Sequence, residues 1–406
     1  MSSFRRLWQS LAVLLGAASA SASGLSLARP FGAHMVLPMD RPVPLRGTAA
    51  AHAEVTVTFG SLTVRAESDA QGAWRVLLPP MPASTDSRKL VVVSGNETLA
   101  LDDILVGRVW LCSGQSNMDF PLSRAVGGAA EATLAGNSPH IRLFNLTGAP
   151  TDARAYDAAT LARLNPRDHF TGQWECASEK SAAAFSAVAW WTGKRILQRD
   201  GVPVGLVENA VGGSGTEAWL PAETLASRHE YHGLSGSGWL GSETMSAWAR
   251  GRAKQNLGTH LEASHPFKPG FLFESGVRSF AGFPFDGVFW YQGETNAESP
   301  DTAWNQRLIT DLVADWRSSL GDADLPFFII QLPRIGGNDP LRRYWPQYRR
   351  AQANAVRALK ATSLVVTEDL GWDSPDVHPP DKLPVAKRLA DAVAGRATGR
   401  NLKPVR

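Results

Sequence analysis

Residues 110–118 read Trp110-Leu111-Cys112-Ser113-Gly114-Gln115-Ser116-Asn117-Met118. An apolar run that begins at Val106 ends here in a glycine turn, and a serine follows the turn. This order predicts a strand whose carboxyl end presents a hydroxyl, close to backbone N–H groups that can hold an oxyanion. Taken alone, a serine in a turn more often caps or hydrogen-bonds than reacts. Met118 stands where a G-x-S-x-G elbow has its second glycine, which argues against an ordinary α/β-hydrolase.

Strands and helices alternate after Val106. Further apolar strand candidates are Val204 to Val211, Gly287 to Tyr291, Phe327 to Leu332 and Leu364 to Thr367. Helix-like stretches include Trp304 to Ser318, Tyr348 to Leu359 and, after Pro379 and Pro380, about Lys382 to Ala394. The alternation predicts an α/β fold with a parallel sheet covered on both faces. Ligands bind outside the carboxyl ends of such strands, so polar residues that follow strands are the site candidates.

Other segments lack this alternation. From Leu25 to about Leu105 the chain shows short strands with turns between them, at Val55 to Phe59, Trp74 to Leu78 and Leu90 to Val93, which predicts a small β-sandwich. The stretch from about Gly233 to Gly282 has no clear period and is expected to form long loops over one end of the sheet. We therefore divide the chain into residues 23–105 and 106–406, after a leader at 1–22.

The leader resembles a secretory signal. Arg5 and Arg6 precede a short apolar run, Leu11 to Ala18, and the small-x-small patterns Ala18-Ser19-Ala20 and Ala20-Ser21-Ala22 follow it. The run is too short to span a bilayer. A secreted or periplasmic protein, with no membrane partner once the signal is removed, is expected.

Composition excludes some partners. The 406 residues include 41 basic and 38 acidic side chains, a formal net charge of +3, which gives no electrostatic case for nucleic acid or an anionic membrane surface. The length favours two domains. Export permits a disulfide between Cys112 and Cys176, but the apolar setting of Cys112 favours a buried free thiol.

Three more polar segments follow predicted strands or precede the last helix. One segment is Asp373-Ser374-Pro375-Asp376-Val377-His378-Pro379. Its histidine could be a general base that a nearby carboxylate orients, or it could be a surface residue beside an aspartate that caps the next helix. Gly287-Val288-Phe289-Trp290-Tyr291-Gln292-Gly293-Glu294-Thr295-Asn296 offers Gln292 as an amide donor. Asn209-Ala210-Val211-Gly212-Gly213-Ser214 allows a bare backbone N–H to approach a substrate.

Together these segments occur in the order of the SGNH hydrolase blocks and resemble the sialate O-acetylesterase family. The resemblance rests on Gly114-Gln115-Ser116-Asn117-Met118, Gly212-Gly213, Trp290-Tyr291-Gln292-Gly293-Glu294-Thr295-Asn296 and Asp376-Val377-His378-Pro379. It extends upstream to His34-Met35-Val36-Leu37-Pro38 and Gly72-Ala73-Trp74-Arg75-Val76, and downstream to Trp316-Arg317, Pro326-Phe327-Phe328 and Gln331-Leu332, so it covers nearly the whole chain.

The resemblance implies an SGNH-type three-layer α/β/α domain and a serine esterase that removes O-acetyl groups from carbohydrates. Ser116 would be the nucleophile and His378 its base. The backbone N–H groups of Ser116 and Gly213 and the side chain of Gln292 would hold the oxyanion. No metal or organic cofactor is implied, and His229-Glu230-x-His232 lacks the spacing of a helical zinc site.

The acid of the triad is left open. The common spacing is D-x-x-H, but Pro375 stands three residues before His378. Asp376 is preferred because it needs no assumed turn; Asp373, Glu294 or a serine–histidine dyad are the alternatives.

The substrate is also open, between acetylated plant polysaccharides and sialic acid. Family kinship supports a fold more strongly than a substrate. A broad short-chain carboxylesterase would differ in accepting butyrate and longer esters, and a non-catalytic glycan-binding protein would release no acetate.

Overall fold

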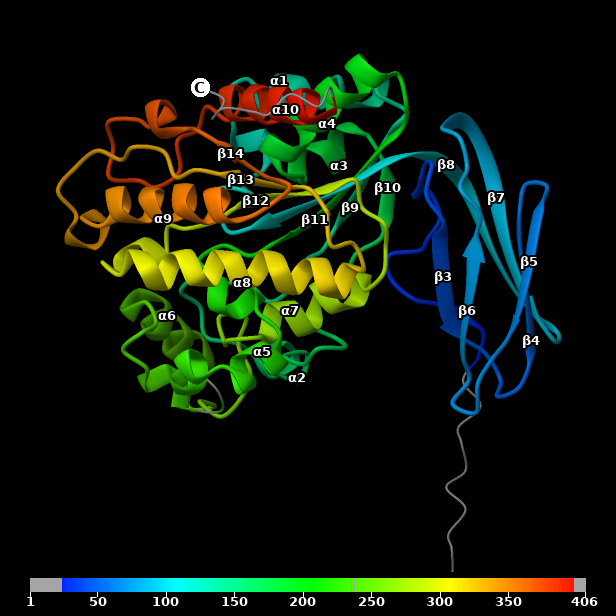
Figure 1. The fold of residues 1–406 in the computed structure, drawn as a ribbon, viewed down its shortest axis with the longest axis horizontal. Helices are drawn as coiled ribbons and strands as arrows, with labels where there is room; N and C mark the ends of the chain where they lie inside the picture. The colour runs from blue at the N-terminus through cyan, green and yellow to red at the C-terminus, as the bar shows by residue number, and fades with distance from the viewer. Residues whose placement is uncertain (1–23, 235, 237, 398–406) are drawn as a thin grey trace, which may run out of the picture.

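One strand, β8 (Glu97–Gly114), runs through both parts of the molecule (Figure 1). This computed structural model describes residues 24–234, 236 and 238–397, so the predicted leader at 1–22 lies outside the described residues. The first half of β8 alternates exposed and half-buried positions, and from Ile104 onward it is almost wholly buried. The sequence explains the change, because a continuous apolar run, which needs cover on both faces, begins after Asp103. The boundary predicted between residues 105 and 106 falls inside this strand.

The strands before β8 form two sheets. The first contains β1 (Ser26–Leu27), β3 (Val43–Thr48) and β6 (Ala73–Leu78). In the second, β2 (Val36–Pro38) and β7 (Ser84–Ser94) pair with β8, and β4 (Glu54–Phe59) pairs with β7 and β5 (Leu62–Glu67). All three strands predicted in this region are present, within β4, β6 and β7. In β4, Val55, Val57 and Phe59 are fully buried, as the period-two pattern of that segment predicts.

The second half of β8 lies at the centre of a mainly parallel sheet. The strand order is β10 (Trp174–Cys176), β9 (Ile141–Asn145), β11 (Val204–Ala210), β8, β12 (Gly287–Tyr291), β13 (Phe327–Ile330) and β14 (Thr362–Val365). Only the pairing of β10 with β9 is antiparallel in this series. The predicted α/β class is confirmed, and β12 has the predicted bounds.

Helices lie on both sides of this sheet (Figure 1). On one side α4 (Ala187–Asp200) packs against α10 (Leu383–Ala397), and on the other α8 (Thr302–Leu320) packs against α9 (Trp345–Ala358). The last three of these were predicted to within a few residues. Shorter helices complete the chain: α1 (Gly128–Thr133), α2 (Ala158–Ala162), α3 (Glu179–Ala184), α5 (Ala222–Ser227), α6 (Ala247–Leu257) and α7 (Phe271–Ser275).

The expectation of long loops from 233 to 282 is wrong in part, because α6 and α7 lie there. The side chain of Ser246 caps α6 by accepting a hydrogen bond from the N–H of Ala249. The buried positions of α6 have helical spacing, but two are alanines and one is an asparagine: Ala249, Ala253, Asn256 and Leu257. An apolar stripe is therefore invisible in the sequence.

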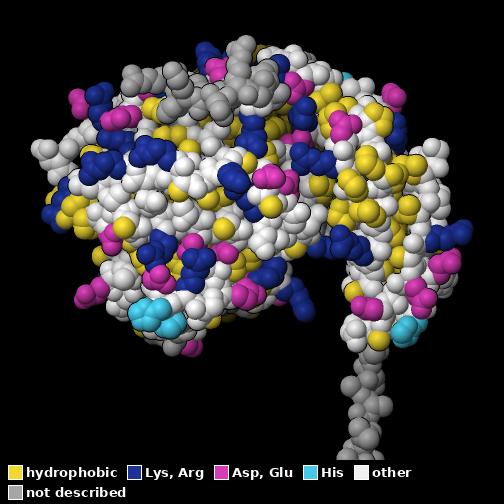
Figure 2. Space-filling model, viewed as in Figure 1, with side chains coloured by type: hydrophobic (Ala, Val, Ile, Leu, Met, Phe, Trp, Pro, Cys, Tyr) yellow, Lys and Arg dark blue, Asp and Glu magenta, His cyan; other side chains and the backbone are white. Residues whose placement is uncertain are grey.

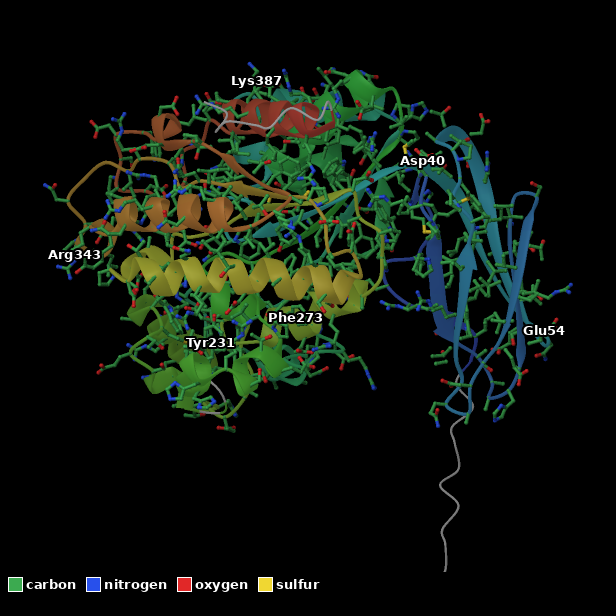
Figure 3. The ribbon with its side chains drawn as sticks, viewed as in Figure 1. Asp40, Glu54, Tyr231, Phe273, Arg343 and Lys387 are labelled. Carbon is green, nitrogen blue, oxygen red and sulfur yellow. The ribbon has the colours of Figure 1, made fainter. Side chains whose placement is uncertain are left out.

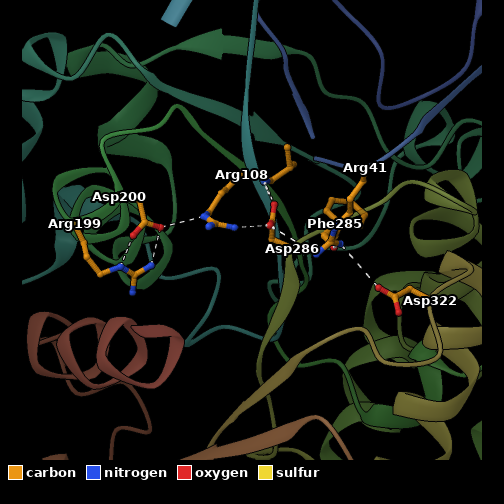
Figure 4. A network of polar contacts seen from close by, with 8 residues as sticks. Arg41, Arg108, Arg199, Asp200, Phe285, Asp286 and Asp322 are labelled. Carbon is orange, nitrogen blue, oxygen red and sulfur yellow. Dashed lines mark hydrogen bonds and ion pairs between the residues drawn. The ribbon is translucent and has the colours of Figure 1, made fainter. Parts of the chain in front are cut away.

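Polar contacts fix the strands before β8 to the large sheet. Figure 4 shows Arg108, in β8, between the carboxylates of Asp200 and Asp286, with its nitrogens 3.0 and 3.1 Å away. Arg41 donates to the carbonyl of Phe285 at 2.7 Å and lies 3.9 Å from Asp322. Arg41 lies before β8, whereas Phe285 and Asp322 lie after it, so the Arg41 contacts join the two parts of the chain.

The surface agrees with the balanced composition. Lys and Arg side chains are interspersed with Asp and Glu over the face seen in Figure 2. Glu54, on β4, and Arg343 lie toward opposite ends of the long axis (Figure 3). No helix within the described ranges is long and apolar enough to cross a membrane. Cys112 is a buried free thiol, as preferred from the sequence, and Cys176 is free and exposed.

Candidate active site

Ser116 follows β8 at the carboxyl end of the sheet. The turn between them needs Gly114, whose φ is +137° and where an added Cβ would lie 2.1 Å from the carbonyl oxygen of Tyr291. The N–H of Gln115 donates to that same carbonyl at 3.0 Å, so the turn rests on the end of β12. The sequence thus bends the chain sharply after the strand and leaves the serine at the edge of a cleft.

The structure brings Ser116 and His378 together from positions 262 residues apart. The Nε2 of His378 lies 2.7 Å from the Oγ of Ser116, and its Nδ1 lies 2.7 Å from Oδ1 of Asp376. The imidazole therefore contacts a hydroxyl and a carboxylate through opposite nitrogens, which is the arrangement of a serine–histidine–acid triad.

The loop before α10 explains how an acid only two residues away reaches the ring. Oδ1 of Asp376 also accepts the backbone N–H of His378 at 3.1 Å, so the carboxylate is turned back on its own chain. The indole of Trp372 donates to the carbonyl of Asp376 at 2.8 Å. The hydroxyl of Ser374 accepts a hydrogen bond from the backbone N–H of Asp376 at 3.1 Å. Asp373 is exposed, and no hydrogen bond joins it to His378 in the described part of the chain.

The glycine segment after β11 faces the same cleft. Thr151 donates to the carbonyl of Gly212 at 2.8 Å, and Thr295 donates to the carbonyl of Gly213 at 3.0 Å. The backbone N–H of Gly213 has no acceptor among the described residues, and the same is true of the N–H of Ser116. At Gly213 φ is +79° and a Cβ would lie 2.7 Å from the ring of Trp248, so only glycine fits.

Gln292 is placed differently from the prediction, and the geometry argues against it as an oxyanion donor. It is fully buried and does not line the cleft. Its Nε2 donates to Asn296 at 2.6 Å and to Gln115 at 3.2 Å, while its Oε1 accepts from Thr216 at 2.7 Å and Tyr348 at 3.0 Å. Every hydrogen-bonding group of the side chain is therefore used inside the protein.

Gln115 lines the cleft, as Gln292 does not, although it is only 2% exposed. Its Oε1 is held by the N–H groups of Gly293, at 3.2 Å, and Thr295, at 3.4 Å. Its Nε2 has no acceptor among the described residues, and the side chain lines the cleft beside Ser116. Gln115 belongs to the quoted serine motif, but that motif does not reveal which way its amide points.

A buried polar group lies beneath the triad. The amide of Asn117 donates to Glu294 and, at 2.9 Å, to the carbonyl of Val377, the residue before His378. Its oxygen accepts from the ammonium of Lys382. Glu294, one of the alternative acids, therefore binds Asn117 and forms no hydrogen bond with His378 within the described ranges.

Burial dominates the ionisation of this group. Desolvation raises the pKa of Glu294, although the hydrogen bond from Asn117 and the nearby charges of His378 and Lys382 oppose the rise. Desolvation also lowers the pKa of Lys382 to about 7, against the attraction of Glu294 and Asp376. Sequence reasoning missed Asn117 and Lys382, because nothing in the pattern shows that they meet.

The cleft has a volume of about 380 Å³ and is lined by aromatic, basic and acidic side chains in addition to the triad. Trp248 is 38% exposed and packs over Gly213. Arg342 and Glu298 line another part of the wall. The cleft itself offers no group of three clustered metal ligands; among the described residues such a group occurs at His34, Asp103 and Cys176, away from it.

Comparisons with known proteins agree with the expected family. Residues 241–394 match the family described as carbohydrate esterase, sialic acid-specific acetylesterase. The sialate O-acetylesterase of Mus musculus is 26% identical over 375 residues, and that of Homo sapiens is 26% identical over 373 residues. Each alignment covers 84% of this chain, and 67% and 65% of those proteins. The chain therefore spans about two thirds of the length of these relatives.

Among solved structures, a carbohydrate acetylesterase from Xanthomonas citri superposes with a TM-score of 0.71 at 29% identity, covering 93% of this chain and 76% of that one. Because the superposition covers 93% of this chain, the likeness includes residues from both parts of it. The sequence relatives, the family match and this structure together make the chain a relative of the sialate O-acetylesterases, within the carbohydrate O-acetylesterase class of hydrolases.

Proposed function

We propose that this protein releases acetate from O-acetylated carbohydrates through an acetyl-enzyme formed on Ser116. The observation that carries the proposal is the 2.7 Å contact between the Ser116 hydroxyl and Nε2 of His378, at the mouth of a cleft whose nearby backbone N–H groups, those of Ser116 and Gly213, have no acceptor among the described residues. A triad of this kind activates a hydroxyl that is otherwise a weak nucleophile.

In the first half-reaction the Oγ of Ser116 attacks the acetyl carbonyl while His378 takes its proton at Nε2. Asp376 holds the ring through Nδ1 and stabilises the imidazolium. The N–H groups of Ser116 and Gly213 and the side-chain amide of Gln115 receive the oxyanion, so Gln115 replaces Gln292 in that role. His378 then returns the proton to the departing sugar oxygen, and the bond from the acetyl carbon to that oxygen breaks.

In the second half-reaction water attacks the acetyl ester of Ser116, and His378 accepts the water proton and passes it to the serine oxygen. Acetate leaves and the free serine is restored. Trp248 supports a sugar as substrate, because a partly exposed indole offers an apolar face to a pyranose ring. Its place over Gly213 would set that ring beside the oxyanion donors.

The architecture supports the same assignment. We infer that residues 106–406 form an SGNH-type three-layer domain, since helices lie on both sides of a parallel sheet whose strand ends carry the quoted blocks in order. We assign residues 23–105 to a small β-sandwich that precedes it. We also propose export by the leader at residues 1–22, which the mass of the mature amino terminus would test.

The test of function is acetate release from a panel of acetylated xylan, xyloglucan, pectin and sialic acid. Wild-type enzyme should act on at least one, and Ser116→Ala should lower turnover by several orders of magnitude with folding intact. His378→Ala should lose nearly as much, and the double variant scarcely more, because the two residues act as a unit. A Ser116→Ala protein within tenfold of wild type would refute the nucleophile, and equal turnover of acetyl and butyryl esters would favour a broad carboxylesterase.

A further inference from the structure

A second constellation lies outside the cleft, where the strands before β8 meet the edge of the large sheet. His34 precedes β2, Asp103 lies in β8, and Cys176 ends β10. Their donor atoms fall within 4.8 Å of one another, although the residues are far apart in the sequence. The function proposed above uses none of them.

The geometry is that of a chelating group and differs from that of a second triad. In the active site His378 contacts its two partners through opposite nitrogens. Here one nitrogen, Nδ1 of His34, faces both partners: it lies 2.8 Å from Oδ2 of Asp103 and 3.6 Å from Sγ of Cys176. Sγ in turn lies 3.4 Å from the same Oδ2. A sulfur, a nitrogen and an oxygen therefore converge on one point.

The separations suit a tetrahedral ion. With metal–sulfur bonds of about 2.3 Å and metal–nitrogen and metal–oxygen bonds of about 2.0–2.1 Å, the donors of a tetrahedral zinc site lie roughly 3.3–3.6 Å apart. The sulfur–nitrogen and sulfur–oxygen distances, 3.6 and 3.4 Å, already have these values. The nitrogen–oxygen pair, now hydrogen-bonded at 2.8 Å, would have to lengthen by only about half an ångström.

The surroundings hold two of the three ligands in place. The guanidinium of Arg142 donates to both oxygens of Asp103 at 3.0 Å, which fixes the orientation of the carboxylate. His34 and Asp103 both adopt left-handed backbone conformations, with φ of 66° and 58°. A thiolate and a carboxylate would together offset the two positive charges of the ion. The positive charge of the nearby Arg142 would then not prevent the ion from binding.

The site is reachable from solvent. Cys176 is exposed on the edge strand, and His34 also lines a separate cavity of about 470 Å³. A fourth position is therefore open to water or to a small ligand, as in three-ligand zinc sites.

We propose that Cys176, His34 and Asp103 bind a divalent transition-metal ion, with zinc the preferred ion because its ligands are thiolate, imidazole and carboxylate. Binding displaces the thiol proton to solvent and joins Sγ of Cys176 to the ion. The ion ties together three segments, the loop before β2, the middle of β8 and the edge strand β10. Its expected effect is on the stability of that junction, because it lies apart from the catalytic cleft.

The experiment uses the purified chain, stripped with a chelator and then titrated with Co²⁺ and Zn²⁺. Cobalt should bind at one equivalent and give a thiolate-to-cobalt charge-transfer band, and one equivalent of zinc should displace it and raise the thermal midpoint. In Cys176→Ser the band should vanish, and in His34→Asn affinity should fall at least tenfold. Asn suits the His34 position because it tolerates a positive φ.

His229→Asn is the matched control, because it removes a histidine that pairs with His232 at the surface outside the constellation. Circular dichroism and acetate release should show that all three variants are folded. Folding of Cys176→Ser is expected because Cys176 is exposed. The proposal is overturned if cobalt gives no sulfur band, if zinc binds only at millimolar concentration, or if Cys176→Ser binds as wild type does. Loss of binding in His229→Asn alone would place the ion at the surface histidines and would also overturn it.

Discussion

The support of His378 by Asp376 is the residue-scale feature most open to test. Asp376 meets both Nδ1 and the backbone N–H of His378, whereas Asp373 meets neither in the described part of the chain. Asp376→Asn should keep the loop but lose the anion that holds the tautomer, so turnover should fall at least about a hundredfold. Asp373→Asn, the same chemical change in the same loop, should stay within about threefold of wild type.

Steady-state acetate release from one substrate would decide between the two carboxylates. A dead Asp373→Asn variant would reverse their roles. Full activity in both variants would point to a serine–histidine dyad.

We expect different roles for two glutamines: Gln115 as an oxyanion donor and Gln292 as a structural residue. Gln115→Ala should lower kcat by about a hundredfold with little change in KM, because the amide contacts charge that develops only in the transition state. Gln292→Ala removes a buried hub instead, so we expect a loss of about 1–3 kcal/mol in the free energy of unfolding. Steady-state kinetics measures kcat and KM, and denaturant unfolding measures the free energy of unfolding. A large loss of kcat in Gln292→Ala, with normal kcat in Gln115→Ala, would instead assign Gln292 as the oxyanion donor.

Single residues were predictable where a motif or a spacing constrained them. Ser116 and His378 are indicated by ordered motifs, and Asp376 is preferred because it needs no assumed turn. The sequence does not separate Gln292 from Gln115 as the amide donor, because both follow strands, and only packing decides which of the two side chains lines the cleft. The trio of His34, Asp103 and Cys176 is invisible for a related reason, because its members meet only through the tertiary fold.

At the scale of elements, predictions succeeded where the hydrophobic pattern was strong. β12 is a run of buried residues with the predicted bounds, and α8 and α10 were found to within about three residues. α6 was missed because alanine and asparagine fill its buried face. β8 was recognised only from Val106 onward, because its first half alternates as an independent strand would.

The start of α10 carries a titration that stability measurements can detect. Lys382 is 1% exposed, and burial lowers its pKa to about 7, whereas the unfolded chain keeps the ordinary lysine value near 10.5. Between these values the unfolded state holds a proton that the folded state lacks. Stability therefore gains from this group as pH rises from about 7 toward 10.5, by at most about 1.4 kcal/mol per pH unit.

Lys382→Met removes the titrating group and keeps an apolar stem of similar length. The wild type should gain about 1–2 kcal/mol relative to the variant between pH 7 and pH 9, in denaturant unfolding at a series of pH values. Lys387→Met, on the exposed face of the same helix, serves as the control and should show no such trend. A pH-independent difference between wild type and Lys382→Met would contradict the expectation.

At the scale of the whole molecule, the two predicted parts are more tightly joined than their sequences indicate. The composition changes near residue 105, but β8 continues through it and pairs with β7 on one side of that point and with β11 and β12 on the other. Three arginines from before β8 also reach across. Arg46 donates to the carbonyls of Ala281 and Ser279 at 2.6 and 2.5 Å, and Arg29 and Arg41 make similar bonds.

These contacts predict that residues 106–406 do not fold alone. A chain of residues 106–406 would lose the first half of β8 and would expose the sites where Val36, Leu37 and Leu105, each no more than 1% accessible, now pack. Each buried aliphatic side chain contributes about 1.5–3 kcal/mol, so the loss of several is comparable to the whole stability of a domain, about 5–15 kcal/mol. We expect the truncated chain to be insoluble or unfolded and to release no acetate.

A point variant shows whether the junction itself matters. Arg46→Met removes two charge-assisted bonds to carbonyls that then lack partners, so the free energy of unfolding should fall by about 1–3 kcal/mol while kcat is unchanged, because Arg46 lies outside the cleft. Arg75→Met changes the exposed arginine paired with it on β6 and should cost less than about 0.5 kcal/mol. Equal stability of the two variants, or a soluble 106–406 chain with wild-type kcat, would show that the strands before β8 form an independent unit.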